Sequence, residues 1–408
     1  MIPAGWSKKA IGDFLIEYRE KSTTQDQFEV LTSSRTGLIP QSDYYSGGRI
    51  NARDNVGFHI VPPGHATYRS RSDDGNFYFN LNDLGLTGIV SHFYPVFKFK
   101  DGDVEFFVEL LNYHRSQIGT RSVGSSQKVL SLNALRQIQL PVPPLKERHR
   151  IIDIFKTWDH AIEKVEALIA NARAQKQALM QQLLPQDTTP PRKRLPGFSG
   201  EWKRAALGEI GTISSAGVDK KIVEGETKVR LLNFLDAYKR EFIYDAELDH
   251  VVTAPKAKVQ GCSIKKGDVF FTPSSETRDD IALAAVAAED MPGVVYSYHV
   301  VRFRPTKKLD LNFSAFLFQT DDFKRQAYRL GDGSGQRYVI SQSNFRKMQV
   351  SLPDVAEQAA IGSLLAEHSA SIAEYETQLT ALRQEKAALM QQLLTGKRRV
   401  KLPESEVA

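Results

Sequence analysis

The heptapeptide ALMQQLL occurs twice in the chain, at Ala178–Leu184 and again at Ala388–Leu394, 210 residues further on. Sliding the chain along itself by that distance aligns 124–184 with 334–394 without a gap, and looser matches continue upstream. Two copies are too few for a solenoid. The sequence therefore predicts a tandem duplication of about 200 residues, a pseudo-two-fold object like a homodimer fused into one polypeptide.

The second part of each copy predicts a long helix. Apolar residues follow one another in alternating steps of four and three from Ile151 and from Ile361, which is the spacing of a coiled-coil seam. A helix of roughly 38 residues would be about 57 Å long at ~1.5 Å per residue. The seam residues expected to pair are Ile151, Phe155, Trp158, Ile162, Val165, Ile169, Leu179 and Leu183 in the first helix and Ile361, Leu365, Ile372, Tyr375, Leu379, Leu382, Leu389 and Leu393 in the second.

These two helices are expected to pack on each other in antiparallel fashion, because a pseudo-two-fold axis across them would reverse their direction. The open alternative is two amphipathic helices, each buried separately against its own domain. Both seams contain one lysine at the same place, Lys176 and Lys386. Burying an unpaired ammonium group is costly, so each lysine is expected to extend to solvent or to lie where the seam opens.

The first part of each copy reads as a globular, mixed domain, with strand-like runs rich in Val, Phe and Tyr. A helix is expected over 311–330, with a counterpart over 104–117. The fold class is therefore α+β, with two mixed α/β domains joined by two long antiparallel helices. The predicted boundaries are 1–140 for the first globular domain, 141–185 for a central helical spacer, 186–205 for a proline-rich basic linker, 206–350 for the second globular domain, 351–395 for a C-terminal helical spacer and 396–408 for a basic tail.

Composition restricts the class of protein. The net charge is +6, and the isoelectric point near 9.1 favours a polyanionic partner. Cys262 is the only cysteine, which excludes an internal disulfide framework and a cysteine-based zinc site and makes a reducing cytoplasm the expected compartment. No apolar run reaches the ~18 residues of a membrane span.

Two variable globular domains that alternate with two matched helices resemble the specificity subunit of Type I restriction–modification enzymes. The segments that carry the resemblance are GSSQKVLSLNALRQIQLPVPPLKERHRI (124–151), GSGQRYVISQSNFRKMQVSLPDVAEQAAI (333–361) and the LMQQLL helix ends. The resemblance implies that each globular domain is a target-recognition domain that reads one half of a bipartite sequence in double-stranded DNA. It also implies that the helices set the spacing between the halves and dock two methyltransferase (M) subunits, with restriction/translocase (R) subunits as further partners.

Candidate DNA contacts lie in loops that combine Arg or Lys with Ser, Gln and Gly. Arginine can bridge guanine, amide side chains can bridge adenine, and hydroxyl groups can hold phosphates. A single loop arginine is more often plain solvated surface, and the polar turn that both copies keep near residues 124 and 333 is the better candidate. The predicted contacts are Arg49, Arg53, Arg69, Arg71, Arg115, Arg121, Ser125, Gln127 and Lys128 in the first copy and Ser274, Ser275, Arg278, Arg329, Ser334, Gln336, Arg337 and Tyr338 in the second.

No motif for chemistry is found. The sequence has no Asn-Pro-Pro-aromatic or Asp-Pro-Pro-aromatic motif, no P-loop and no H-E-x-x-H spacing, so no catalytic or metal-ligating residue is predicted. We expect a non-catalytic subunit, with adenosylmethionine, ATP and Mg²⁺ bound only by partner subunits, which would carry out methylation and cleavage. The alternatives are a coiled-coil adaptor that binds only protein, or another DNA-binding protein without a restriction role. DNA binding by the assembled complex, and its salt dependence, would discriminate between them.

Overall fold

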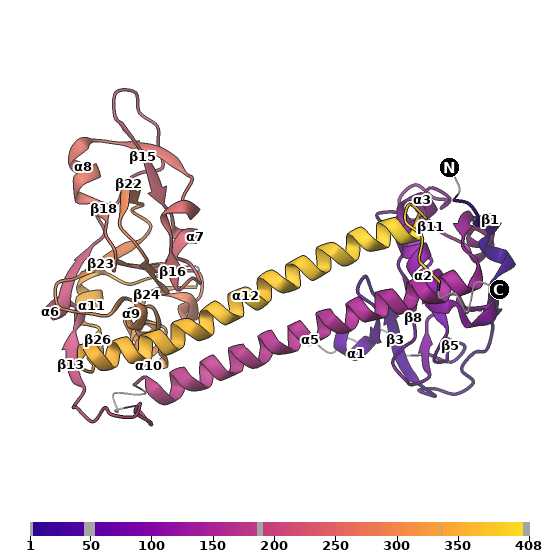
Figure 1. Ribbon diagram of the computed structural model, residues 1–408, viewed down its shortest axis with the longest axis horizontal. Coiled ribbons are helices and arrows are strands. Elements are labelled where there is room, and N and C mark those ends of the chain that lie inside the picture. Colours follow the sequence, from indigo (N-terminus) through magenta and orange to yellow (C-terminus); the bar gives the residue numbers. More distant parts are fainter. Residues whose placement is uncertain (1–2, 45–53, 186–190, 336, 403–408) are drawn as a thin grey trace. The chain divides into compact units, whose positions relative to one another are not determined.

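The computed structural model describes residues 3–44, 54–185, 191–335 and 337–402. The chain divides into two compact units, and each is described by itself (Figure 1). Unit 1 comprises Met1–Lys164 and Leu379–Ala408, and unit 2 comprises Val165–Gln378. The predicted mixed α/β character is found in both units.

Two helices far exceed the others in length, α5 (Leu145–Leu183) and α12 (Val355–Leu394). Prolines precede both, where a fixed φ suits a helix start, and Ala, Leu, Gln and Glu dominate their sequences. The one glycine in α12, Gly362, is required by packing: a Cβ there would lie 2.4 Å from the backbone nitrogen of Phe313.

The globular part of unit 1 is built on two four-stranded sheets. The first has the order β2 (Leu15–Tyr18), β10 (Val96–Phe99), β6 (Ala66–Tyr68), β8 (Phe79–Leu81), and the second β4 (Leu38–Pro40), β3 (Glu29–Ser33), β9 (Gly88–Val90), β5 (His59–Val61). Helix α2 (Val104–Tyr113) packs on the first sheet through buried aromatic rings, with Phe107 stacked on Phe99 at 4.4 Å between centroids. Smaller elements are β1 (Ser7–Ala10) paired with β12 (Gln139–Val142), β7 (Arg71–Ser72) paired with β11 (Lys128–Val129), and the short helices α1 (Gln41–Tyr44), α3 (Arg115–Gly119) and α4 (Leu132–Arg136).

Unit 2 contains a five-stranded sheet and a four-stranded sheet. Their orders are β14 (Gly211–Ser214), β23 (Val301–Pro305), β19 (Val269–Phe271), β21 (Ala284–Ala287), β16 (Phe242–Ile243), and β17 (Val251–Ala254), β15 (Thr227–Leu232), β22 (Met291–Tyr296), β18 (Ser263–Ile264). Two smaller groups are β13 (Lys203–Ala206) with β26 (Gln349–Leu352), and β20 (Ser274–Ser275), β25 (Arg337–Val339), β24 (Asp332–Ser334). The helices are α6 (Leu207–Ile210), α7 (Phe234–Ala237), α8 (Lys256–Gly261), α9 (Leu311–Leu317), α10 (Asp321–Leu330) and α11 (Gln342–Lys347).

The single helix predicted over 311–330 is wrong in one respect, because the structure divides it into α9 and α10. Thr320 has extended backbone angles, and its hydroxyl accepts a hydrogen bond from the Phe323 N–H, so a new helix begins there. The counterpart over 104–117 is also divided, into α2 and α3 at His114, although His114 has no extended backbone angles and its side chain makes no capping hydrogen bond. Apolar periodicity continues across both breaks and conceals them.

Both copies of ALMQQLL end inside a globular core. Leu393 and Leu394 at the end of α12 are buried in the core of unit 1, together with Ile151 and Phe155 from the start of α5. In unit 2 the end of α5 and the start of α12 share a core in the same way, through Leu183, Leu184, Ile361 and Leu365. The repeated peptide is therefore the apolar end by which each long helix joins a globular domain.

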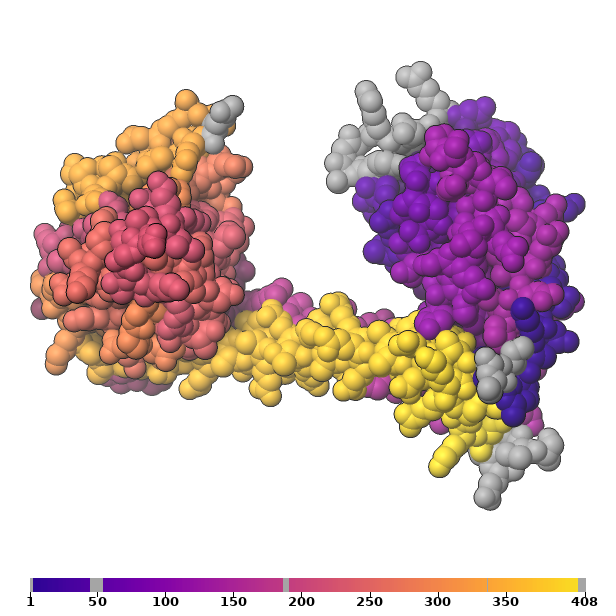
Figure 2. All heavy atoms as spheres, turned by 90° about the horizontal axis from the view of Figure 1, so that it is seen from above, coloured from indigo at the N-terminus to yellow at the C-terminus, as the bar shows by residue number. Residues whose placement is uncertain are grey.

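A buried glutamate near the start of each long helix is held by an arginine from elsewhere in the chain. In unit 1, Glu147 accepts hydrogen bonds from the Arg399 guanidinium and, at 3.0 Å, from Trp6 Nε1. Arg399 also donates to the carbonyl of Ala4, and Figure 2 shows the yellow C-terminal segment lying against the indigo N-terminal one. Within unit 1 these contacts join the segment around Ala4 and Trp6 to the segment around Arg399.

The corresponding glutamate of unit 2, Glu357, is held by Arg194 from the linker. Both carboxylate oxygens accept a guanidinium N–H, and the arginine carbon lies 5.9 Å from the ring centroid of Trp202. Bidentate pairs of this kind fix geometry as well as charge. The tail in one unit and the linker in the other thus supply the same contact.

Candidate nucleic-acid interface

In unit 2, strand pairing brings together predicted contacts that lie some 60 residues apart in sequence. Strand β20 pairs with β25 so that Ser274 faces Val339 and Ser275 faces Tyr338, and β24 adds Ser334 opposite Arg337. Arg337 Nη2 donates to Ser274 Oγ at 3.1 Å. We call β20, β24 and β25 the ribbon of unit 2.

Aromatic rings hold one arginine beside this ribbon. The guanidinium carbon of Arg278 lies 4.8 Å from the ring centroid of Tyr338 and 5.4 Å from that of Tyr328. Stacking of this kind orients the planar group while leaving N–H donors at its edge. The ribbon therefore presents hydroxyl and guanidinium groups in a fixed arrangement, which suits the recognition of phosphates or base edges.

The ribbon of unit 1 consists of β7 and β11, in which Lys128 pairs with Ser72 and Val129 with Arg71. The turn before β11 depends on Gly124, whose φ is +112° and where a Cβ would lie 2.2 Å from the carbonyl oxygen of Gln127. Gly333 plays the same part in unit 2, since a Cβ there would lie 2.1 Å from the carbonyl oxygen of Arg337. Both polar turns thus require glycine for the same steric reason.

Further cationic and aromatic side chains surround the ribbon of unit 1. The guanidinium carbon of Arg71 lies 3.9 Å from the ring centroid of Phe93, and those of Arg35 and Arg115 lie 5.7 and 5.4 Å from the ring centroid of Tyr78. Arg69 and Arg71 both line two pockets of about 330 and 290 Å³ beside β7. Sequence reasoning missed Arg35, Tyr78 and Phe93, because nothing in their local pattern distinguishes them from ordinary strand and loop residues.

Carboxylates shape the same surface. Asp74 accepts hydrogen bonds from the Asn76 N–H at 2.9 Å and the Ser72 hydroxyl at 2.7 Å, and it pairs with Arg35 at 2.9 Å. These donors, the backbone N–H first, lower the pKa of Asp74 to about 2. The carboxylate is therefore ionised at neutral pH and holds the turn after β7, while Gln127 donates to the neighbouring Asp73 at 3.3 Å.

Some of the predicted DNA contacts do not lie among the ribbon residues and the side chains described beside them. Arg121 and Ser125 are exposed, the former just after α3 and the latter in the turn before β11. Arg329 is exposed in the last turn of α10, and within the described part of the chain its side chain has no hydrogen bond or ion pair. Arg49, Arg53 and Gln336 lie outside the described residues.

The predicted seam residues are the less exposed positions of the two long helices. Val165 and Ile169 are each 6% exposed, whereas most of the neighbouring positions on α5 are exposed. The buried seam residues are Ile151, Phe155, Val165, Ile169, Leu183, Ile361, Leu365 and Leu393, and the partly buried ones are Trp158, Ile162, Leu179, Ile372, Tyr375, Leu379, Leu382 and Leu389. The pattern of exposure thus follows the heptad spacing.

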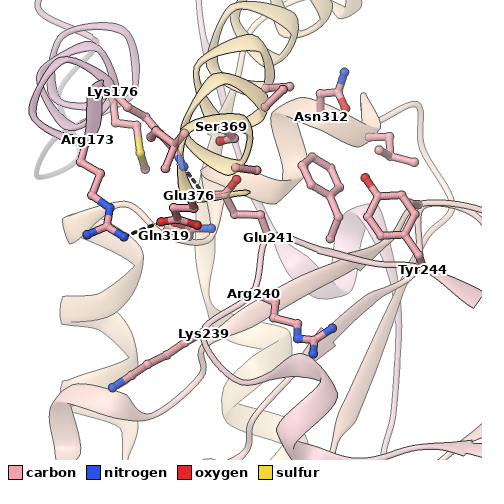
Figure 3. A pocket seen from close by; sticks show the side chains of 18 of the residues that line it. Arg173, Lys176, Lys239, Arg240, Glu241, Tyr244, Asn312, Gln319, Ser369 and Glu376 are labelled. Carbon is pink, nitrogen blue, oxygen red and sulfur yellow. Dashed lines mark hydrogen bonds and ion pairs between the residues drawn. The ribbon is translucent and has the colours of Figure 1, made fainter. Parts of the chain in front are cut away.

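The seam lysine of unit 2 meets a carboxylate of the globular domain (Figure 3). Lys176 forms an ion pair with Glu241, and its Nζ lies 5.1 Å from the ring centroid of Phe316. Arg173, one turn earlier on α5, donates to Glu376 of α12 at 2.5 Å. The four charged residues, Arg173, Lys176, Glu241 and Glu376, line an open pocket of about 1440 Å³ to which both long helices and the globular domain contribute.

The seam lysine of unit 1 is also paired. Lys386 forms an ion pair with Asp159 of α5 and lies near the partly buried Glu109 of α2. Burial raises the pKa of Glu109, Asp159 raises it further, and the positive charge of Lys386 opposes both effects. Each lysine is therefore neutralised by a carboxylate, with only 14% of the Lys176 side chain and 17% of the Lys386 side chain exposed.

No group of three His, Cys, Asp or Glu side chains that could hold a metal ion is found among the described residues. A search of the same part of the chain finds no helix long and apolar enough to cross a membrane.

Each of the two α/β units contains part of both long helices and one ribbon of hydroxyl and cationic groups. The chain belongs to the family described as the Type I restriction modification DNA specificity domain, whose family model matches residues 3–171 and 199–383. It is a Type I restriction–modification specificity subunit by family.

Individual proteins are similar to this chain in sequence or in fold. The Type I restriction enzyme MjaVIII specificity subunit of Methanocaldococcus jannaschii is 23% identical over 327 residues, which cover 78% of this chain and 76% of the relative. The Type I restriction–modification S subunit from M. genitalium has a similar fold, with a TM-score of 0.57 at 14% identity, over 98% of this chain and 97% of that one. A chain from a structural study of complex assembly and conformational transition of the type I R-M system gives a TM-score of 0.56 at 16% identity, over 98% of this chain and 100% of that one.

Proposed function

We propose that each globular domain of this specificity subunit reads one half of a bipartite sequence in double-stranded DNA. The observation that carries the proposal is the presence of one ribbon in each unit, β7–β11 and β20–β25–β24, at equivalent places in the duplicated sequence. Both ribbons present groups that suit phosphates and base edges. Because Arg71, Ser72 and Lys128 stand in one ribbon where Ser274, Ser275 and Tyr338 stand in the other, the two half-sites differ.

The long helices act as the spacer in this proposal. They form an antiparallel coiled coil with pseudo-two-fold symmetry, which fixes the distance between the two half-sites and docks two M subunits. The low exposure of the seam positions supports pairing, as do the contacts between α5 and α12 within each unit, Arg173 with Glu376 in one and Lys386 with Asp159 in the other. Rigid spacers set half-site separation in dimeric DNA-binding proteins by the same geometry.

Chemistry belongs to partner subunits. The chain acts in the cytoplasm in a complex with M subunits and, where present, R subunits, which bind adenosylmethionine, ATP and Mg²⁺. The absence of nucleotide and methyl-donor motifs from the sequence supports this division of labour. One solved relative comes from a study of complex assembly in a type I R-M system, which agrees with a subunit that works inside a larger assembly.

The test is methylation sequencing of host DNA with the gene, without it, and with it restored on a plasmid. We expect one bipartite adenine-methylation motif to disappear on deletion and to return on complementation. A control plasmid encoding the chain without residues 206–350 should restore no such motif. An unchanged set of methylated motifs in the deletion strain would refute the proposal.

A further inference from the structure

An open pocket of about 550 Å³ lies beside the ribbon of unit 2, and it was not foreseen from the sequence. Its lining includes the aliphatic hydroxyl groups of Ser274, Ser275 and Thr277, the phenol of Tyr238, the cationic side chains of Lys220 and Arg337, and the carboxylates of Glu276 and Asp280. Within the described residues that line it there is no Asn or Gln. Hydroxyl groups and cations without amides suit an oxyanion better than the edge of a base.

The pocket depends on a close approach of two chain segments. Val218 forms a parallel bridge with Ser297, and its N–H donates to the carbonyl of Tyr296 at 2.9 Å. Gly217 makes this possible, because a Cβ at that position would lie 2.1 Å from the backbone nitrogen of Tyr298. The bridge brings the segment that contains Lys220 to the loop that contains His299, so both line the pocket.

The positive charges in the pocket are not neutralised by the protein. In the described part of the chain, Lys220 has no ion pair or hydrogen bond, and Arg337 is bonded only to a neutral hydroxyl, that of Ser274. The carboxylate of Asp280 is already engaged, since it accepts the Tyr238 hydroxyl at 2.8 Å and lies 3.5 Å from Lys239 Nζ. The other carboxylate of the lining, Glu276, is exposed to solvent.

The pKa of His299 is affected by the same positive charges. Its pKa is lowered by partial burial and then by the charges of Lys220 and Arg337. The imidazole is therefore neutral at pH 7 and can donate one N–H without adding to the charge. The groups in the lining that could donate to a bound anion are the two cations, the neutral imidazole and the hydroxyl groups of Ser274, Ser275 and Thr277, while Asp280 is held by Tyr238 and Lys239.

We propose that this pocket binds one phosphodiester group of the DNA backbone and so fixes the position of the second globular domain on the duplex. Lys220 and Arg337 supply the charge, and Ser274, Ser275 and Thr277 supply hydroxyl donors. The inference rests on the proposed function, because it assigns a phosphate contact within the DNA that the unit reads. Phosphate contacts fix register and carry no sequence information directly.

The experiment measures DNA binding by the assembled complex with M subunits at several salt concentrations, for the wild type and for Lys220→Ala with His299→Gln. Loss of one phosphate contact should make the slope of log K against log salt less steep by about 0.9. Affinity should fall for all sequences alike, and the methylated motif should stay the same. The Lys220→Arg variant keeps the positive charge and should retain the wild-type slope. Lys307 is an exposed lysine that follows β23, and Lys307→Ala is the matched control, which should leave the slope unchanged.

Two results would overturn the inference. An unchanged slope and affinity in the double variant would show that no phosphate occupies the pocket. A changed second half-site would show that the pocket reads a base. Neither result touches the proposed function, which instead fails if the wild-type complex has no sequence-specific binding at all.

Discussion

Replacing Arg194 with alanine should release the linker from the start of α12. The Glu357 side chain is fully buried and accepts two N–H groups from Arg194, whose own side chain is 25% exposed. Breaking a buried ion pair from one side costs roughly 3–5 kcal/mol, because it strands the other charge. Since water can enter where Arg194 was partly exposed, we expect about 2–3 kcal/mol for Arg194→Ala.

Hydrogen–deuterium exchange of residues 191–202 is the appropriate assay, because a chain of two units has no single unfolding free energy. A loss of about 2–3 kcal/mol corresponds to exchange roughly 30 to 150 times faster at ~1.4 kcal/mol per tenfold change. Arg192→Ala, an exposed arginine of the same linker, is the matched control and should change little.

A second substitution separates charge from packing. Glu357→Gln removes the stranded carboxylate, so the Arg194→Ala, Glu357→Gln double variant should exchange more slowly than Arg194→Ala alone. If Arg194→Ala exchanged within threefold of the wild type, or if the double variant were worse than the single one, the buried carboxylate would not depend on this arginine.

Four further outcomes are expected. The purified chain alone should transfer no methyl group from adenosylmethionine, and methylation without partners would contradict the assignment of chemistry to them. Ile162→Asp combined with Ile372→Asp should prevent assembly with M subunits, measured by size-exclusion chromatography, because each change places a carboxylate in the packed seam. Exchanging residues 206–345 for the matching segment of a relative should change one half-site in the methylated motif and leave the other intact. Lys386→Met should lower the urea midpoint of unit 1 more at pH 8 than at pH 5.5. Because the pKa of Glu109 is raised in the folded state, the free energy of unfolding falls as the pH rises through that pKa and the carboxyl group ionises, and Lys386 is the cation that offsets this fall. Equal shifts of the midpoint at the two pH values would contradict this prediction.

Local periodicity was sufficient for the long helices and insufficient for the candidate interface. The alternating four and three spacing from Ile151 and Ile361 depends only on residues a turn apart, and α5 and α12 follow it. The pairing of β7 with β11, in contrast, joins Arg71 to Val129, and no local pattern encodes a register between strands so far apart. Both segments were predicted from the sequence as candidate DNA contacts, but their pairing with each other could not be predicted.

The seam lysines also show that local periodicity predicts a position on a helix but not the distant residue that it contacts. The heptad pattern located Lys176 and Lys386, and the cost of burying an unpaired charge led to the expectation that each ammonium group reaches solvent or lies where the seam opens. In the structure each ammonium group is instead paired with a carboxylate, that of Glu241 in one unit and that of Asp159 in the other. Glu241 lies in a globular domain. The spacing of apolar residues along a helix does not indicate which face of that domain packs against the helix, so this partner of Lys176 could not be predicted.

The two copies differ where recognition is proposed and agree where the helices are held. Glu147 and Glu357 are equivalent, buried and paired with arginine, although one arginine comes from the tail and the other from the linker. The ribbons keep their strand register and their obligatory glycines, but their side chains change from Arg, Ser and Lys to Ser, Ser and Tyr. A scaffold that must keep its geometry while its two readers accept different bases would retain the clamps and turns and vary the side chains that the ribbons display. Under the proposed function, this difference in constraint accounts for helix ends that are identical in the two halves of the sequence and for ribbons that are not.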